Sequence, residues 1–571
     1  MTGDSSIEEI FFEVNRNIQK KNYDLAISHL KKILEFDKSN LKAIFLLGTM
    51  LLQTKKFNDA KSFFLKAILI SPKFSNAHNN LGIVHKELGQ SKEAEKNFIS
   101  AIKINPKSIE AYNNLGLLYK ELDELEKSKI NFEIAIHINP NYVVAYSNLS
   151  TVYKKMEEFD KSERLLIKAI QLQPNFLDAH INLMEIYEKT NKDSKLNNAI
   201  ISAENEFKNK PEVNFYKAKL LYKKEFFLKT IEILNSFKFN ENISLEILRN
   251  SVLAKSYDKL NNIDKAFEFF QISNELTFKH KSTNINKDKY IALVNSRLSI
   301  IKTITDKEWP TTNLKNKMAE PVFMIGFPRS GTTLLDTILR SHPLVEVIEE
   351  KPILKTLIDS LEKLHSGSYQ ALKKINEYKI KKIRNNYYKE LIFYIKERDP
   401  KKIYIDKLPL NIIHIAEILT IFPEAKFIFS VRHPCDCVLS CFMQDFKLNN
   451  AMSNFIDLND TAYLYEKIMR LWFEYKSKFS FNFHEIRYEN LISNFENELR
   501  PLLIFLGLKW NDSIFEFQKV AKNRKRIFTP SYEQVIKPIY QSSVNRWTRY
   551  KTYFSKVYPI LKPWIKKLNY E

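Results

Sequence analysis

A short glycine-bounded loop is the first place in this 571-residue chain where the residue types could do chemistry. The apolar run PVFMI precedes Gly326, polar residues follow it, and Gly331 opens a segment with helical periodicity. A strand, a glycine-bounded loop and a helix form a phosphate cradle, because backbone N–H groups and the positive end of the helix face the anion. The whole chain has only nine glycines, so two at one loop are informative. The sequence therefore predicts a phosphate-binding loop here.

This loop differs at one position from the loops of nucleoside triphosphatases. Its spacing fits the pattern G-x4-G-K-[ST], except that Thr332 stands where the pattern has lysine. That lysine reaches the β- and γ-phosphates, so its absence disfavours an ATPase, a GTPase or a P-loop kinase. Arg329, inside the loop, supplies a cation instead. The predicted ligand is a nucleotide with a shorter phosphate chain.

A second anion site is predicted further along the chain. The apolar run AKFIFSV is typical of a buried strand that leads to Arg432, and Ser440 lies on the helix expected next. A guanidinium and a hydroxyl at the carboxyl end of a strand can bind a phosphate through charge-assisted hydrogen bonds. Two phosphate sites in one α/β domain indicate a nucleotide phosphorylated at two positions.

These motifs resemble those of sulfotransferases. FPRSGTTLL is similar to their 5′-phosphosulfate loop, and VRHPCDCVLS is similar to their 3′-phosphate motif. RSGTT…SHP…EVIEEK, IRYENLI and SYEQVIKP…NRW resemble, in the same order, motifs of protein-tyrosine sulfotransferases, and the resemblance covers about residues 319–550. It implies 3′-phosphoadenosine 5′-phosphosulfate (PAPS) as co-substrate, 3′-phosphoadenosine 5′-phosphate (PAP) as product, and no metal. His433-Pro434 departs from the tyrosine enzymes' Asp-Gly and is similar to the cytosolic branch.

The resemblance also implies roles for individual side chains. Glu350 matches the general base for the acceptor hydroxyl, and Glu349 beside it stays an alternative. Arg329 and Lys407 match cations at the sulfuryl group and the leaving phosphate oxygen, and Ser531 matches a serine near that oxygen. The residues implied to bind the co-substrate are Arg329, Ser330, Gly331, Thr332, Thr333, Arg432, Ser440, Tyr488 and Arg546.

Sulfuryl transfer itself requires side chains of these types. Like phosphoryl transfer, it places negative charge on the leaving phosphate, where cations stabilise it. A tyrosine acceptor with a pKa of about 10 needs a base at its hydroxyl group. Arg546 takes the slot of a phosphate-binding lysine in the family and keeps that positive charge. Arginine and lysine together can supply the charge that a metal would otherwise bring.

The elements that must position this chemistry follow a 34-residue repeat. Gly48, Gly82 and Gly116 are 34 residues apart, and prolines and alanines recur with the same spacing. Each unit contains two amphipathic helices, with a small residue where they cross and a proline after the second. The pattern resembles the tetratricopeptide repeat from about residue 20 to 190, and degenerate copies continue to about 280. It predicts an α-solenoid.

Asparagines recur in the same register, at Asn80, Asn114, Asn148 and Asn182. In tetratricopeptide arrays this position faces the concave groove. Because each amide offers a donor and an acceptor, such a row can hold an extended polypeptide without reading its sequence. The alternative is that these amides only hydrate or cap the inner helices. The row favours a polypeptide acceptor presented by the repeats.

The predicted fold class combines an α-solenoid with a P-loop-like α/β domain around a central parallel sheet. We expect a tetratricopeptide-repeat solenoid over residues 1–280, a helical linker over 281–318 and a PAPS-dependent sulfotransferase domain over 319–571. The predicted function is sulfuryl transfer from PAPS to an acceptor hydroxyl, with tyrosine in a polypeptide favoured. A glycan, lipid or small-molecule acceptor stays open, and so does a non-catalytic repeat scaffold.

Composition limits the remaining choices. Hydrophobic residues make up 44% and charged residues 27%, which excludes an intrinsically disordered chain. The net charge of +22 suits an anionic partner, such as a nucleotide, a nucleic acid, an acidic peptide or an anionic glycan, and of these we do not expect a nucleic acid. The only cysteines, Cys435, Cys437 and Cys441, cannot build a disulfide framework, and neither a signal peptide nor a long apolar run is present. We therefore expect a cytoplasmic protein without a membrane anchor, of open oligomeric state.

Overall fold

The structure is a computed structural model that describes residues 3–281, 285–304, 320–365, 372, 375–395, 397–523 and 543–571. It contains two compact units, Met1–Leu220 and Leu221–Glu571. The domain boundaries expected near residues 280 and 318 mark changes of sequence pattern, and they remain predictions.

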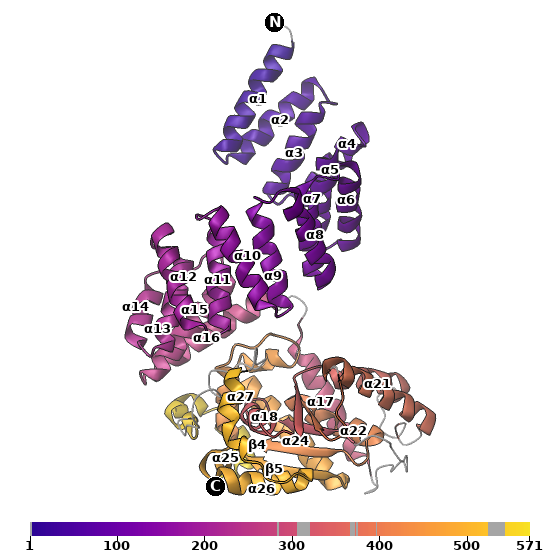
Figure 1. Ribbon diagram of the computed structural model, residues 1–571, viewed down its shortest axis with the longest axis vertical. Coiled ribbons are helices and arrows are strands. Elements are labelled where there is room, and N and C mark those ends of the chain that lie inside the picture. The colour runs from indigo at the N-terminus through magenta and orange to yellow at the C-terminus, as the bar shows by residue number, and fades with distance from the viewer. Residues whose placement is uncertain are drawn as a thin grey trace. The chain divides into compact units, whose positions relative to one another are not determined.

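The first unit is a succession of paired helices (Figure 1). Its helices are α1 (Gly3–Gln19), α2 (Tyr23–Phe36), α3 (Leu41–Gln53), α4 (Phe57–Ile70), α5 (Ser75–Glu87), α6 (Ser91–Ile104), α7 (Ile109–Glu121), α8 (Leu125–Ile138), α9 (Val143–Lys155), α10 (Phe159–Leu172), α11 (Leu177–Lys189), α12 (Asp193–Glu206) and most of α13 (Pro211–Lys223). The expected helical solenoid is confirmed.

The close crossing inside each pair explains the periodic glycines. A Cβ atom on Gly48, Gly82 or Gly116 would lie 2.9, 2.6 or 2.8 Å from a phenylalanine ring on the second helix of the same pair. No side chain fits at such distances, so glycine allows the ring to pack directly against the first helix. The hydroxyl of Ser128 then donates to the carbonyl oxygen of Gly116 at 2.7 Å and fixes the crossing.

The turn between the two helices of each pair also follows the 34-residue period. Residues with positive φ recur at Lys21, Lys55, Gly89, Asp123, Glu157, Asn191 and Glu225. Their spacing of 34 residues shows that the same turn is used from the first pair onward. Asn261, with a φ of 59°, repeats it after a slightly longer interval. The paired pattern therefore continues beyond the first unit, as the degenerate copies in the sequence predict.

The second unit begins with the last of these paired helices and continues into an α/β domain (Figure 1). The helices before the sheet are α14 (Phe227–Asn235), α15 (Ile243–Lys259), α16 (Ile263–Lys281) and α17 (Lys287–Lys302). The strands are β1 (Val322–Gly326), β2 (Val345–Glu349), β3 (Ile403–Lys407), β4 (Lys426–Val431) and β5 (Asn482–Arg487). The helices around the sheet are α18 (Thr332–Arg340), α19 (Ile353–His365), α21 (Glu377–Ile395), η1 (Pro409–His414), α22 (Ile415–Ile421), α23 (Pro434–Phe442), η2 (Met452–Phe455), α24 (Leu458–Lys478), α25 (Tyr488–Ser493), α26 (Phe495–Leu506), η3 (Asp512–Glu516), α27 (Phe517–Asn523), η4 (Arg546–Phe554) and α29 (Tyr558–Lys567).

The five strands form one parallel sheet in the order β2-β3-β1-β4-β5, which confirms the expected α/β class. Strand β1 is central, so the loop after it lies between the ends of β3 and β4. Alternate residues of β1 face opposite layers, as the pleat requires. Met324 belongs to an apolar cluster with Leu502 of α26, whereas the ring of Phe323 lies 6.1 Å from that of Tyr387 on α21. Helices therefore cover both faces of the sheet.

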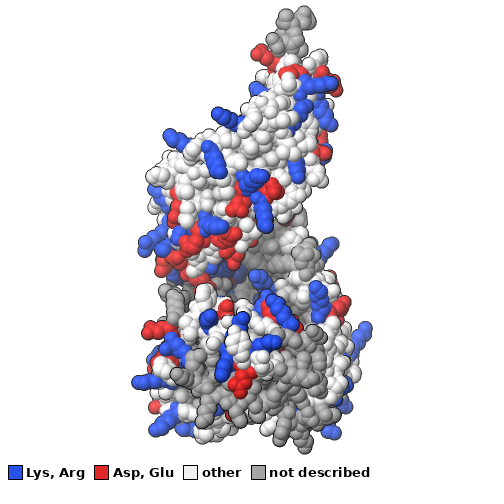
Figure 2. All heavy atoms as spheres, turned by 90° about the vertical axis from the view of Figure 1, so that its right-hand side faces the viewer, with Lys and Arg blue, Asp and Glu red and all other residues white. Residues whose placement is uncertain are grey.

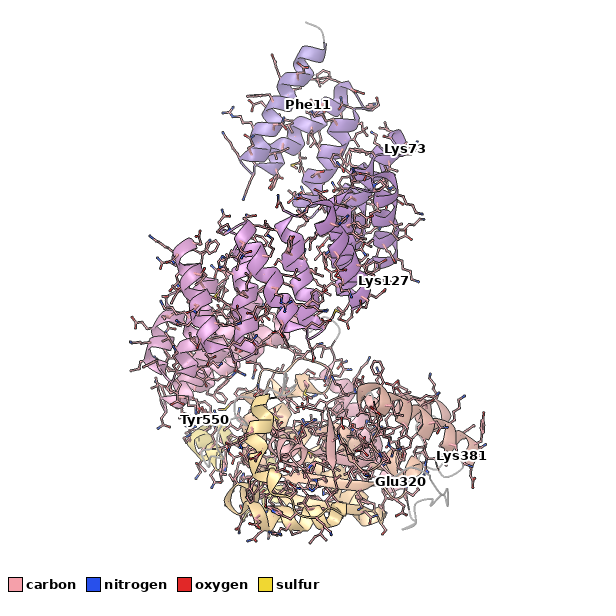
Figure 3. All side chains as sticks on the ribbon, viewed as in Figure 1. Phe11, Lys73, Lys127, Glu320, Lys381 and Tyr550 are labelled. Carbon is pink, nitrogen blue, oxygen red and sulfur yellow. The ribbon has the colours of Figure 1, made fainter. Side chains whose placement is uncertain are left out.

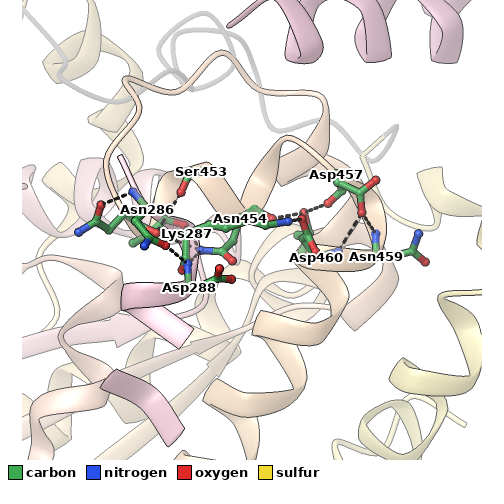
Figure 4. Close-up of polar contacts among 11 residues, drawn as sticks. Asn286, Lys287, Asp288, Ser453, Asn454, Asp457, Asn459 and Asp460 are labelled. Carbon is green, nitrogen blue, oxygen red and sulfur yellow. Dashed lines mark hydrogen bonds and ion pairs between the residues drawn. The ribbon is translucent and has the colours of Figure 1, made fainter. Parts of the chain in front are cut away.

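Helix α17 is held against the sheet domain by a polar network (Figure 4). The Lys287 ammonium group lies 2.5 Å from Oδ2 of Asp460, and the backbone N–H of Asn286 donates to Oδ1 of Asn450 at 3.0 Å. The amide of Asn454 donates to the carbonyl oxygen of Lys287 at 3.4 Å. The helix expected between repeats and sheet domain is thus part of the second unit.

Candidate functional site

The predicted phosphate loop joins β1 to α18 at the carboxyl edge of the sheet. Gly326 has a φ of 155° and Gly331 a φ of 101°, values that side chains rarely allow. A Cβ on Gly326 would lie 2.7 Å from the carbonyl oxygen of Ser430, and one on Gly331 would lie 2.6 Å from Cδ2 of Tyr488. The two glycines therefore let the loop pass between β4 and the Tyr488 ring, so the cradle is closed on both sides.

Arg329 is connected directly to the second predicted anion site. Its Nε donates to the hydroxyl oxygen of Ser440 on α23 at 3.0 Å, and its carbonyl oxygen accepts a hydrogen bond from Arg432 Nη1 at 3.1 Å. Arg329 has a φ of 69°, a conformation uncommon outside glycine and typical of constrained functional loops. The structure thus brings Arg329 into contact with Arg432 and Ser440, which lie more than one hundred residues later in the sequence.

Tyr488 lies beside Arg432, and with Arg329 and Ser440 these residues form one corner of the candidate site. The guanidinium carbon of Arg432 lies 4.8 Å from the centre of the Tyr488 ring, and the Tyr488 hydroxyl lies 2.7 Å from Oγ of Ser543. Arg432 Nη2 donates to the carbonyl oxygen of Ser543 at 2.6 Å. Ser543 was not singled out in the sequence, although Arg546, three residues later, was predicted to bind the co-substrate.

Two buried polar atoms in the corner fit an anionic ligand. The hydroxyl oxygen of Ser330 and Nε of Arg432 are buried and have no hydrogen-bond partner among the residues that the structure describes. Ser330 has 1% and Arg432 7% of its surface exposed. Unpaired buried donors are costly, and phosphate oxygens would satisfy both. The residues present therefore fit a nucleotide phosphate.

The second part of the site surrounds Lys407 at the end of β3. Its side chain has no exposed surface, and its ammonium nitrogen lies 3.1 Å from Oε1 of Glu350 and 3.4 Å from Oε1 of Glu349. The buried Asp336 carboxylate of α18 lies 4.0 Å away. Three carboxylates therefore face the Lys407 ammonium group and hold it in place next to the predicted phosphate loop.

The two adjacent glutamates differ in environment. Glu349 ends β2 opposite Lys407 of β3 and is 4% exposed, whereas the Glu350 side chain keeps 33% of its surface exposed. Glu350 has a φ of 50°, and its backbone N–H donates to the carbonyl oxygen of Lys407 at 2.8 Å. This left-handed turn points the two carboxylates differently while both reach Lys407. Only Glu350 combines contact with Lys407 and access from outside.

Asp336 is a site residue that the sequence did not single out. It lies within the apolar helix after the phosphate loop, is completely buried, and pairs with Arg340 one turn later. A charged residue on the buried face of an amphipathic helix was the available signal, because such residues rarely occur there without a partner.

Arg546 has a partner that the sequence did not indicate. Its Nη2 donates to Oδ2 of Asp258 on α15 at 2.7 Å. The backbone around it is held next to the predicted second anion site, because the N–H groups of Asn545 and Trp547 donate to the carboxylate of Asp436 on α23 at 2.8 and 2.9 Å. Ser531, predicted near the leaving oxygen, lies outside the described residues.

Histidine and cysteine side chains in this region have structural environments. His433 Nδ1 accepts the backbone N–H of Cys435 at 3.3 Å and caps α23, and burial, together with Arg432, lowers the pKa of His433 to about 4. Cys435, Cys437 and Cys441 are buried free thiols, and burial raises the pKa of each. Across the described ranges, no group of three or more His, Cys, Asp or Glu residues is arranged to hold a metal ion.

The asparagine row of the repeats forms a connected set of amides. Asn114 Nδ2 donates to Asn79 Oδ1 at 3.0 Å, and Asn148 Nδ2 donates to Asn113 Oδ1 at 2.9 Å. The row continues with Asn80 donating to Thr49 and Asn182 donating to Ser147. All four row amides are half-buried. One donor of each is therefore used between neighbouring repeats, which orients the amides, and their role toward a guest stays a prediction.

On the face that Figure 2 shows, the charges of the described residues do not single out another site. Lysine and arginine side chains are spread over this face and interspersed with acidic ones. The cations that matter for the site, such as Arg432 and Lys407, are buried. Among the described residues, no helix is both long and apolar enough to cross a membrane.

The fold and the site together define an α/β domain in which a glycine-bounded loop follows the central strand and contacts Arg432 and Ser440 through Arg329. Residues 321–512 match the family model described as "Sulfotransferase family". Residues 41–74, 109–142 and 143–176 match a tetratricopeptide repeat model, and related repeat models match 63–96 and 86–123. The chain therefore carries tetratricopeptide repeats followed by a sulfotransferase-family domain, which confirms both resemblances.

Several proteins are similar to part of this chain. An uncharacterized protein of Aquifex aeolicus is 28% identical over 329 residues, which are 56% of this chain and 42% of that protein. Protein-tyrosine sulfotransferase 1 of Danio rerio is 23% identical over 277 residues, 47% of this chain and 77% of the relative. The human protein of the same name is 23% identical over 49% of this chain and 77% of its own length. The chain thus spans less than half the length of the Aquifex relative.

Solved structures are similar to part of the chain. A tetratricopeptide repeat protein from Parabacteroides merdae is 19% identical over 44% of this chain and 99% of that protein, with a TM-score of 0.36. The crystal structure of MamA is 25% identical over 28% of this chain and 94% of its own, with a TM-score of 0.26.

Proposed function

We propose that this protein transfers a sulfuryl group from PAPS to the hydroxyl of a tyrosine in a polypeptide. The observation that carries the proposal is the joining of two anion subsites with a buried cation. Arg329 contacts Ser440 and Arg432 on one side, and Lys407 with its glutamates lies at the neighbouring strand end. A 3′-phosphate and a 5′-phosphosulfate need such a pair of subsites at one sheet edge.

In the proposed reaction, the phenolic oxygen of the acceptor attacks sulfur in line with the leaving phosphate oxygen. The new bond joins that phenolic oxygen to sulfur, and the bond between sulfur and the 5′-phosphate oxygen breaks. Glu350 takes the phenolic proton, and Lys407 and Arg329 stabilise the charge that develops on the leaving oxygen. PAP leaves with the bonding electrons, so the step needs no oxidant.

The polypeptide acceptor is supported by the repeats and by the relatives. Tetratricopeptide arrays present extended concave surfaces to partners. The oriented amides of Asn114 and Asn148 offer hydrogen-bonding groups at regular intervals, which suits the repeating backbone of an extended chain. Relatives that match the sulfotransferase domain carry the name protein-tyrosine sulfotransferase. A glycan, lipid or small-molecule acceptor would need the same donor site.

The donor is tested by calorimetric titration of the full chain with PAP, with ATP as the control. We expect tight binding of PAP and no measurable binding of ATP, because Thr332 replaces the lysine that reaches the outer phosphates of ATP. Folded protein that fails to bind PAP would refute the donor and leave a non-catalytic repeat scaffold as the better explanation.

The acceptor is tested with labelled PAPS and three matched peptides that carry Tyr, Phe or Ser at one position. Label should enter only the Tyr peptide. Transfer to a free phenol at the same kcat/KM as to the peptide, or transfer to oligosaccharides and no peptide, would contradict the polypeptide acceptor while leaving the donor site intact.

A further inference from the structure

A single buried carboxylate on a repeat-type helix connects to the nucleotide site. Asp258 lies on α15, and its side chain keeps only 6% of its surface exposed. Its Oδ2 accepts from Arg546 Nη2 at 2.7 Å, and its Oδ1 accepts from Arg549 Nη2 at 2.8 Å and from the Tyr550 hydroxyl at 2.7 Å. Tyr550, labelled in Figure 3, is fully buried. Nothing in the sequence around Asp258 indicates this role.

The backbone of the contacted segment is fixed at the predicted 3′-phosphate subsite. Arg432 donates to the carbonyl oxygen of Ser543, and Asp436 accepts the N–H groups of the residues on either side of Arg546. The backbone of Arg546 therefore cannot shift freely. Among the described residues, Asp258 is the only side-chain partner of Arg546. The position of the Arg546 guanidinium group therefore depends on Asp258.

Charge around this contact favours an anion. One carboxylate faces two guanidinium groups, so the cluster of Asp258, Arg546 and Arg549 carries a net positive charge. The Arg546 side chain keeps 24% of its surface exposed, in contrast to Asp258. Arg546 uses Nη2 toward Asp258, and a guanidinium group has further N–H donors for a phosphate oxygen.

We propose that Asp258 is a positioning residue for the nucleotide site, which orients Arg546 toward the 3′-phosphate of PAPS and PAP. This inference rests on the proposed function. If Asp258 has this role, α15, a helix of the paired-repeat pattern, contributes a residue to the co-substrate site. The paired helices would then contribute to donor binding as well as to acceptor binding.

The test compares PAP with adenosine 5′-monophosphate, which lacks the 3′-phosphate, by titration calorimetry of the full chain. The dissociation constant of the monophosphate divided by that of PAP reports the contribution of the 3′-phosphate alone. Asp258→Asn should lower this ratio about tenfold, the loss expected for one misplaced charge-assisted contact, by weakening PAP while leaving the monophosphate unchanged. Asp258→Glu, which keeps the charge, should lower it less.

Asp264→Asn is the matched control. Asp264 also joins a repeat-type helix to η4, because its Oδ1 accepts from the Tyr553 hydroxyl at 2.7 Å, but it does not contact Arg546. Its removal should leave the ratio unchanged. An unchanged or higher ratio in Asp258→Asn, or an equal loss for both nucleotides, would overturn the inference. Failure of the unaltered protein to bind PAP would instead refute the proposed function.

Discussion

The Lys407 ammonium nitrogen lies 3.1 Å from Oε1 of Glu350, and the Lys407 side chain is fully buried. The two residues belong to neighbouring strand ends, and the N–H of Glu350 also donates to the carbonyl oxygen of Lys407. Only the Glu350 carboxylate of this pair is accessible from outside, which suits Lys407 as the buried cation and Glu350 as the base. Several consequences of this arrangement can be measured.

Replacing Glu350 by Gln should lower kcat about 100-fold or more and leave PAP affinity unchanged, because the base is lost while the nucleotide contacts remain. Glu349→Gln is the matched control, since Glu349 also contacts Lys407 but is buried. Steady-state kinetics with a tyrosine peptide measure both. A larger loss in Glu349→Gln would move the base to that residue.

Arg329→Ala should lower kcat about 100-fold or more, since it removes a cation from the developing charge. Ser440→Ala removes the hydroxyl that Arg329 Nε contacts at 3.0 Å, and it should lower kcat about tenfold or less. Circular dichroism should show that both variants fold. Wild-type turnover in Arg329→Ala would contradict the assignment of this loop.

Gly331→Ala should weaken PAP binding about tenfold or more, because its Cβ would collide with Tyr488 and force the cradle apart. Gly89→Ala is the control: it has a positive φ of 72°, but no atom lies within 4 Å of its Cβ position. It should cost stability without changing PAP affinity. Equal PAP affinity in both variants would argue against the cradle geometry.

Joint replacement of Asn114 and Asn148 by Ala should raise KM for polypeptide acceptors several-fold, because each replacement removes about one hydrogen bond to the acceptor. Turnover of a free tyrosine analogue should not change. Asn97→Ala is the control, because the exposed Asn97 amide donates within its own helix to the carbonyl oxygen of Glu93. If KM rises equally for the free analogue, the amides do not act on the polypeptide.

The buried His433 should make stability depend on pH. Because the pKa of His433 is lowered to about 4 from an ordinary value near 6.5, folding favours the neutral ring. This contribution is complete above about pH 6.5 and is lost as pH falls toward 4, roughly 1–2 kcal/mol at pH 5. His433→Asn keeps a capping side chain that does not titrate.

Thermal melting at pH 7.5 and pH 5 measures this effect. The fall in Tm between the two pH values should be smaller in His433→Asn than in the unaltered protein, by about 2–4 °C. Equal falls in both proteins would show that the ring is not held neutral.

Local patterns were sufficient to predict much of this protein. The 34-residue spacing of Gly48, Gly82 and Gly116 predicts the solenoid, because each helix crossing depends on residues close in sequence. The run from PVFMI to Gly331 predicts the phosphate loop for the same reason. Arg329, Arg432, Ser440 and Tyr488 were also predicted as one site, through a resemblance whose motifs occur in order.

Contacts between distant segments were decided only by the tertiary structure. The different exposure of Glu349 and Glu350 and the bond from Arg546 to Asp258 have no local sequence signal. Each depends on how the sheet brings separate strand ends together or how the end of the chain returns to α15. The sequence by itself determined which elements and motifs the chain contains. Packing decided which side chains meet, because burial and hydrogen-bond partners are properties of the assembled layers.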